Sequence, residues 1–167
     1  TDVSVDVTLA KFREQPINDV VALVSDGPNA PTAVRRAAEF AALSGENARL
    51  RLINVQSVNE EKSRGEIDPS NTAVERGEEI IEGVARQAGL DPREYDTSVL
   101  VGETVESAVT GATNQRDLVC LGLSDRSDLL RDRSGSIAER IHDQTPCNVA
   151  IAKSGRRSSG DNRTSGD

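Results

Sequence analysis

The stretch LVCLGLSDRSDLLRDRSGSIAERI, residues 118–141, carries the signals that decide the fold. It opens with an apolar run that ends at Gly122, continues through a long polar loop, and reaches Gly135 at the start of a helical pattern. Ser136 and Glu139 have the spacing of a capping box, which marks a helix N-terminus. The stretch therefore predicts a buried strand whose carboxyl end faces the amino end of a helix.

Similar apolar runs recur along the chain and alternate with helical patterns. The predicted strands occupy residues 19–24, 50–55, 97–101, 118–122 and 148–152. The first, second and fourth are almost continuously apolar, as expected of parallel strands that are covered on both faces. Strand and helix alternation with right-handed crossovers predicts an α/β domain: an open, doubly wound, five-stranded parallel sheet with helices on both faces.

Four helices connect these strands. They are expected to start near Pro31, Thr72, Val105 and Ser136. Proline is favoured at the first helical position, and Thr72 and Glu75 have capping-box spacing, so both are read as helix starts. In sheets of this kind ligands bind beyond the carboxyl ends of the strands, where neighbouring connections leave on opposite faces. This rule predicts a crevice at the residues that follow Val24, Val55 and Gly122.

The folded body is predicted to be one domain over residues 18–153, since single cores typically serve about 100–200 residues. Residues 154–167 contain no apolar residue and are expected to form a disordered tail. Residues 57–70 are polar and predict a loop. Residues 1–17 form an extension, and apolar and polar residues alternate in its first ten residues, so an extra half-buried strand of unknown partner is predicted there. The alternating residues are Val3, Val5, Val7 and Leu9.

Charge and composition exclude several function classes. The net charge of −8 and the pI of about 4.8 disfavour nucleic acid and anionic membranes as partners. Only three of the 20 basic residues are lysine, and an acidic, lysine-poor surface suggests adaptation to high salt. No apolar run approaches the roughly 20 residues that span a bilayer. We therefore expect a cytoplasmic location, as a soluble protein or as the cytosolic domain of a membrane protein.

Signals for catalysis are weak. The single histidine, His142, lies near the end of the fourth predicted helix, where a surface role is expected. No phosphate-binding G-x-x-x-x-G-K-[ST] loop, dinucleotide fingerprint or serine nucleophile elbow occurs. Cys120 and Cys147 lie in apolar runs and are predicted to be buried, reduced thiols. The chain is not expected to be an enzyme.

The opening stretch resembles the universal stress protein family. Nucleotide-binding members of that family carry G-x2-G-x9-G-[ST], and this chain has Gly122, Asp125, Gly135 and Ser136 at the same spacing. The segments SDGPNAPTAVRRAAEFA, LRLINV, VGETVESAV and QTPCNVAIA are also similar to the family. The resemblance implies the adenine nucleotide alpha hydrolase-like fold, with strand order 3-2-1-4-5.

The resemblance also implies a binding site for ATP or another adenine nucleotide, with no metal beyond Mg²⁺ brought by the nucleotide. Asp26 would contact the ribose or the adenine, and Val55 would line the adenine pocket. The loop glycines and the hydroxyl would hold the phosphates, and main-chain groups near Val24 and Ile137 would complete the site. The implied phosphate ligands are Gly122, Gly135 and Ser136.

Asp125 departs from the family pattern, because a carboxylate stands where a glycine would let backbone approach phosphate. Arg126, in the same loop, supplies a compensating charge. Two hypotheses follow: a regulatory module that binds an adenine nucleotide, or a regulatory or dimerisation domain without one, such as the cytosolic domain of a membrane transporter. Each of these residues also has an ordinary structural explanation. Ser136 would cap a helix, Gly122 would permit a tight turn, and the Asp26 carboxylate would bond N–H groups of its own turn.

A homodimer is the expected assembly. In relatives the last strand is an exposed edge that pairs with its copy, and here that edge strand is residues 148–152. An uncovered edge strand offers unpaired backbone groups that favour such pairing.

Overall fold

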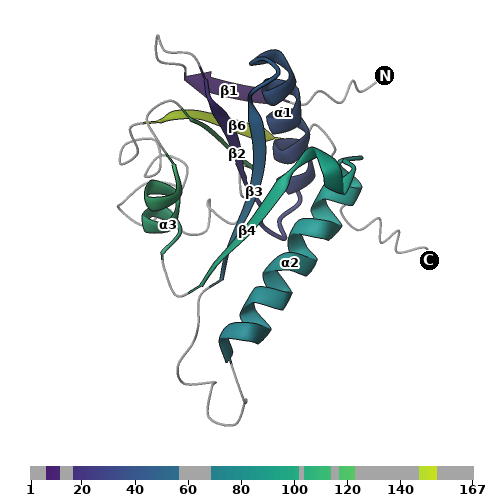
Figure 1. Ribbon diagram of the computed structural model, residues 1–167, viewed down its shortest axis with the longest axis vertical. Helices are drawn as coiled ribbons and strands as arrows, with labels where there is room; N and C mark the ends of the chain where they lie inside the picture. The colour runs from purple at the N-terminus through teal and green to yellow at the C-terminus, as the bar shows by residue number, and fades with distance from the viewer. Residues whose placement is uncertain are drawn as a thin grey trace, which may run out of the picture.

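The apolar run that precedes Val24 forms a strand in the interior of a six-stranded sheet (Figure 1). The strands are β1 (Val7–Lys11), β2 (Asp19–Leu23), β3 (Arg49–Gln56), β4 (Asp96–Val101), β5 (Leu118–Gly122) and β6 (Asn148–Lys153). Their spatial order is β1-β6-β5-β2-β3-β4, and every pair except β1–β6 is parallel. The five parallel strands confirm the predicted order 3-2-1-4-5.

The computed structural model describes residues 7–11, 17–56, 69–101, 104–113, 117–122 and 147–153. Several predicted features therefore lie outside the described residues. These are the fourth helix at Ser136, the tail at residues 154–167, residues 57–68 of the predicted loop, and the outer part of the N-terminal extension.

Helices cover both faces of the sheet, as predicted. They are α1 (Ala30–Leu43), α2 (Pro69–Gln87) and α3 (Val105–Ala112). One buried cluster joins Val34 of α1 and Ile81 of α2 to the strands, and a second joins Val109 of α3 to their opposite face. Figure 1 shows α1 and α2 on one side of the sheet and α3 on the other. We call these two sides the α1 face and the α3 face.

The alternation of side chains assigns each strand residue to one face. In β2, Val20 and Ala22 pack in the α1-face cluster, whereas Val21 packs in the α3-face cluster. All three are almost fully buried. A strand that is covered on both sides has no solvent-facing position, which explains why its sequence is continuously apolar.

Proline and glycine set the helix boundaries. Pro31 lies in the first turn of α1, where its missing N–H costs no helical hydrogen bond. Gly45 and Gly89 follow the ends of α1 and α2 with φ of 111° and 79°, a conformation that suits glycine. The predicted start of α2 at Thr72 is wrong, because the helix already begins at Pro69.

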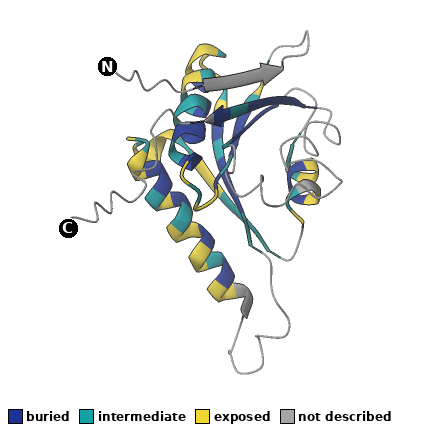
Figure 2. Cartoon of the chain, turned by 180° about the vertical axis from the view of Figure 1, so that it is seen from behind, coloured by how far each residue is buried: buried dark blue, intermediate teal, exposed yellow. Residues whose placement is uncertain are grey.

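Helix α2 packs through one stripe and leaves the rest of its surface exposed. Figure 2 shows buried and exposed residues alternating along it at helical spacing. The buried stripe consists of Ala73, Gly77, Ile81, Val84 and Ala85. This periodicity matches an amphipathic helix whose apolar side faces a sheet.

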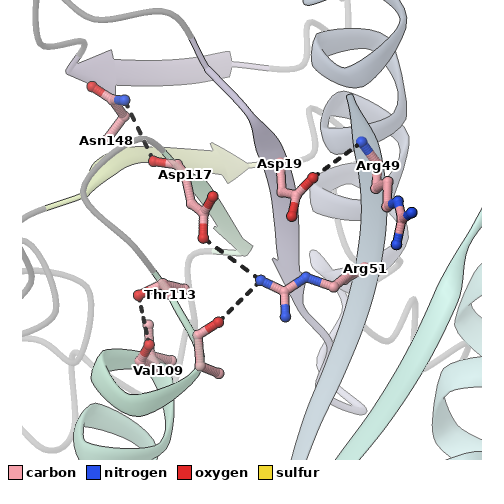
Figure 3. A network of polar contacts seen from close by, with 8 residues as sticks. Asp19, Arg49, Arg51, Val109, Thr113, Asp117 and Asn148 are labelled. Atoms are coloured by element: carbon pink, nitrogen blue, oxygen red, sulfur yellow. Dashed lines mark hydrogen bonds and ion pairs between the residues drawn. The ribbon is translucent and has the colours of Figure 1, made fainter. Parts of the chain in front are cut away.

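A polar network fixes the amino ends of β3, β5 and β6 on the α3 face (Figure 3). Arg51 Nη2 lies 3.6 Å from Asp117 Oδ2 and donates a hydrogen bond of 3.0 Å to the carbonyl oxygen of Ala112, the last residue of α3. The backbone N–H of Asn148 donates to the carbonyl oxygen of Asp117 over 3.0 Å. Asp117 is buried, so Arg51 supplies a charge partner that water cannot provide there.

Strand β1 extends the sheet beyond its five parallel strands. It lies in the N-terminal extension and pairs antiparallel with β6, from Val7 opposite Lys153 to Lys11 opposite Val149. The prediction that the last strand is the exposed edge of the sheet is therefore wrong. Strand β6 has β5 on one side and β1 on the other, so both of its edges are occupied.

Candidate functional site

The strand order places a switch point between β2 and β5. From β2 the chain passes through α1 to β3 on one side, whereas β5 pairs with β6 on the other side. Leu23 pairs with Leu121, so Val24 and Gly122 stand next to each other at the carboxyl ends of adjacent strands. Ligands of open α/β sheets bind in the crevice at such a point. This end of the sheet is the candidate site.

Gly122 lies directly against the amino end of α1. A Cβ atom built on Gly122 would come within 2.9 Å of the carbonyl carbon of Asn29 and 3.0 Å of its carbonyl oxygen. Asn29 is the N-cap residue of α1 and is itself buried. Gly122 is therefore required here by the close approach of a helix start to a strand end.

The turn that leads from β2 to α1 carries Asp26. Gly27 N–H donates to the side-chain oxygen of Ser25 over 3.3 Å, and Ala30 N–H donates to the carbonyl oxygen of Gly27 over 3.2 Å. The turn is thus held by Ser25 and by backbone groups, while Asp26 is exposed. The Asp26 carboxylate is accessible to solvent beside the amino end of α1.

Asn54 is a polar residue of this region that sequence analysis did not select. It is buried, and its Nδ2 donates a hydrogen bond of 2.8 Å to the carbonyl oxygen of Val24. Its Oδ1 accepts a hydrogen bond of 2.7 Å from Gln56 Nε2. Asn54 therefore fixes the backbone where β2 ends and the Asp26 turn begins. An asparagine inside the apolar run LRLINV was the signal that could have found it.

Val55, which the resemblance selected, lies near the carboxyl end of β3, the strand on the other side of β2 from β5. It is half-buried on β3 and pairs with Leu100 of β4. By strand alternation it shares a side of the sheet with Ile53, on the α3 face, whereas Val24 packs on the α1 face. Val24 and Gly122 thus stand side by side, Asp26 follows Val24 by two residues, and Val55 lies near the carboxyl end of β3 on the other side of β2.

The remaining predicted site residues lie outside the described residues. They are Asp125, Arg126, Gly135, Ser136 and Ile137. Gly122 is the one residue of the predicted phosphate loop within the described part of the chain. The place of the other five residues in the site stays a prediction.

Cys120 lies two residues before Gly122 and contributes no reactive thiol. It is buried in the α1-face cluster, and burial raises the pKa of its thiol to about 12. A thiol acts as a nucleophile or metal ligand only as the thiolate, which this environment suppresses. Cys147 is also buried and reduced. Across the described residues, no group of three or more His, Cys, Asp or Glu side chains is placed to hold a metal ion.

An open cleft of about 440 Å³ lies at the opposite end of the sheet from this site. It is lined by Ala38, Ala41, Ala42, Gly45, Glu46, Ala48, Leu50, Leu90 and Glu94. These residues surround the start of β3 and the region that follows α2, so the cleft is separate from the switch point. Most of its lining is small and apolar, and Glu46 and Glu94 are its charged side chains.

An open, doubly wound parallel sheet whose strand order reverses between β2 and β5 is an architecture that many ligand-binding α/β domains share. The family model described as the universal stress protein family matches residues 16–153. The chain belongs to the universal stress protein family. No helix within the described part of the chain is long and apolar enough to span a membrane.

Solved structures of universal stress proteins share this fold at low sequence identity. One that was solved in complex with cAMP is 18% identical, with a TM-score of 0.59, and the match covers 82% of this chain and 97% of that one. A protein from Archaeoglobus fulgidus, solved with dAMP, is 20% identical, with a TM-score of 0.52 and coverage of 82% and 98%. UspA from Lactobacillus plantarum is 17% identical, with a TM-score of 0.53 and coverage of 83% and 99%. No curated protein matched the sequence.

Proposed function

We propose that this chain is a regulatory module that binds an adenine nucleotide in the crevice between β2 and β5. The contact between Gly122 and Asn29 carries the proposal, because it brings a strand end to a helix start beside the exposed Asp26. Open parallel sheets bind their ligands where such strand ends and helix starts meet at the switch point. Two structural neighbours were solved with adenine mononucleotides, cAMP and dAMP, which supports this class of ligand.

In the proposed complex Asp26 accepts hydrogen bonds from the ribose hydroxyls or the adenine amino group. A carboxylate is an acceptor with two oxygens, so it fits these donors and disfavours a phosphate at the same place. The main chain next to Val24 contacts the base, since the N–H of Val24 already donates to Ile53 and its carbonyl oxygen already accepts from Asn54. The phosphate is held by the loop after Gly122, through Gly135 and Ser136.

Asp125 bears on which adenine nucleotide binds. Two like charges about 4 Å apart cost on the order of 1 kcal/mol in water and several times more when partly buried. ATP brings more negative charge to the loop than AMP, so Asp125 penalises ATP more strongly. Arg126 offsets part of this repulsion. We therefore propose that a nucleoside monophosphate binds at least as tightly as the triphosphate.

Titration calorimetry with AMP and with ATP, in molar KCl, tests the proposal. Asp26→Asn is expected to weaken AMP binding about tenfold, as the loss of one hydrogen bond to a charged acceptor predicts. Glu46→Gln is the matched control, because it removes the same charge from an exposed residue at the other end of the sheet. Absence of heat with both nucleotides at millimolar concentration would reject nucleotide binding.

Asp125→Gly tests the phosphate side of the site. This change restores the family's glycine, and it is expected to tighten ATP binding about tenfold or more while affecting AMP less. Equal changes for both ligands would show that Asp125 does not face the outer phosphates. If Asp125→Gly gains no affinity for either AMP or ATP, the loop is not part of the proposed site.

A further inference from the structure

Strand β1 differs from the other strands of the sheet in its direction and in lying outside the part of the chain that matches the family. It is the outermost strand and forms the sheet's one antiparallel pairing. It also precedes the family match, which begins at residue 16. The structural neighbours are covered almost completely, at 97% to 99% of their length, by about four-fifths of this chain. Strand β1 is therefore an addition to a sheet that would otherwise end at β6.

Without β1, strand β6 would be an apolar edge. Val149, Ala150 and Ala152 are all almost fully buried, although they alternate between the two faces of the sheet. A strand that is apolar on both faces and lacks an edge partner readily pairs with a strand from another chain. Proteins commonly block such an edge by covering it.

Strand β1 runs antiparallel to β6, as the β6 strand of a two-fold-related second copy would. A two-fold axis perpendicular to a sheet places the same edge strand of two copies side by side and antiparallel. Strand β1 occupies this position on β6 over five residue pairs. It therefore takes the place that a symmetry-related β6 would take.

The chain is long enough for this pairing within one molecule. Because β1 runs opposite to β6, Lys11 pairs with Val149, near the end of the sheet where β2 starts. Strands β6 and β5 lie between β1 and β2, so three strand spacings separate β1 from Asp19. At about 4.8 Å for each spacing this distance is roughly 14 Å. The eight residue steps from 11 to 19 extend to roughly 26 Å. A connection within one chain therefore needs no strain.

We propose that β1 is an intramolecular cover of the β6 edge, and that its displacement turns β6 into the pairing edge for β6 of a second copy. While β1 is in place, β6 does not pair with a second copy. The homodimer expected through residues 148–152 forms only after β1 has been displaced from β6. The proposal does not depend on nucleotide binding.

A disulfide between β1 and β6 tests whether the cover lies within one chain. Leu9 and Ile151 are register partners, so Leu9→Cys with Ile151→Cys brings two cysteines directly opposite each other, with Cys120 and Cys147 replaced by alanine. After oxidation, non-reducing electrophoresis is expected to show a cross-linked monomer. Leu9→Cys with Val149→Cys is the matched control, because Val149 pairs with Lys11 and lies out of register. A covalent dimer, or equal cross-linking of the control, would overturn the intramolecular cover.

Proline substitution tests the consequence of displacing β1. Alternate residues of an antiparallel strand direct their N–H groups toward the partner, so either Thr8→Pro or Leu9→Pro removes a hydrogen bond to β6. Light scattering is expected to show the monomer mass for the wild type and twice that mass for at least one folded proline variant. The cross-linked Leu9→Cys/Ile151→Cys protein must stay monomeric at the same concentration. A wild type that is already dimeric, or two folded proline variants that stay monomeric, would overturn the proposal.

Discussion

The backbone of Gly122 at the end of β5 touches the backbone of Asn29 at the start of α1, with no room for a side chain between them. The clash that a Cβ would create, at 2.9 Å, involves main-chain atoms that cannot rotate away. Gly122 thus sets how closely the start of α1 approaches the end of β5. It links the packing of the sheet to the proposed nucleotide site.

Gly122→Ala is expected to destabilise the protein by about 1–3 kcal/mol, as overpacking of a tight site does. It should also weaken AMP binding, because α1 must move away from β5 to admit the methyl group. Denaturant unfolding and calorimetry measure the two effects. Unchanged stability would mean that the contact relaxes without cost.

Gly77 and Gly83 on α2 are expected to respond to alanine in opposite directions. A Cβ on Gly77 would lie 2.5 Å from Val99 Cγ1, whereas a Cβ on Gly83 meets nothing within 4 Å. Gly77→Ala should therefore cost about 1–3 kcal/mol by overpacking. Gly83→Ala should stabilise by about 0.5–1 kcal/mol, because alanine favours the helix. Thermal unfolding of the two variants tests this contrast, and a shift in the same direction for both would contradict it.

The parallel sheet could be predicted from sequence because buried strands and crossover connections follow local rules, whereas its strand order was implied by the resemblance to the family. Apolar runs such as the one around Val20 show which strands are covered on both faces, and handed crossovers leave few possible topologies. The partner of β1 could not be predicted in this way. Its alternation indicates a strand, but its pairing depends on which edge the folded sheet leaves open.

The contacts at the candidate site could not be predicted from the sequence, because segments far apart in the chain make them. The sequence offered Gly122 as a turn or a phosphate ligand, and the contact with Asn29 supplies a different reason for the glycine. Asn54 was missed because its role is to hold the carbonyl of Val24, which no motif marks. The start of α2 was misplaced since Thr72 and Glu75 have capping-box spacing even inside the helix.

Asn54→Ala tests whether this buried amide shapes the site. The change leaves the carbonyl oxygen of Val24 without its donor and Gln56 without its acceptor, which should cost about 1–3 kcal/mol of stability. It should weaken AMP binding as well, since the Asp26 turn begins at Val24. Gln56→Ala is the control, because it removes one bond to Asn54 and leaves the bond to Val24. Equal loss of affinity in both variants would argue against a specific role for Asn54.

The ion pair between Arg51 and Asp117 is expected to matter more than the shorter one between Arg36 and Glu39. Arg36 Nη1 lies 2.6 Å from Glu39 Oε2, but the Glu39 side chain is 54% exposed, so Glu39→Gln should cost less than about 0.5 kcal/mol. Asp117 is 2% exposed, and Arg51→Met should cost about 1–3 kcal/mol by leaving its carboxylate with less compensation. Unfolding measured in low and molar salt separates them, because screening acts mainly on the exposed pair. Equal costs for both variants would contradict this ranking.

Cys120 should be unreactive in the folded protein and should make stability fall at high pH. Burial raises the pKa of its thiol from 9.0 to about 12, so at pH 8 almost no thiolate is present to react. In a Cys147→Ala background, iodoacetamide should label Cys120 only after denaturant is added. Between about pH 9 and 12 the unfolded chain loses this proton and the folded chain keeps it, so stability should decrease by up to about 1.4 kcal/mol per pH unit. Cys120→Ala should lack that slope, and rapid labelling of the native protein at pH 8 would contradict the buried thiol.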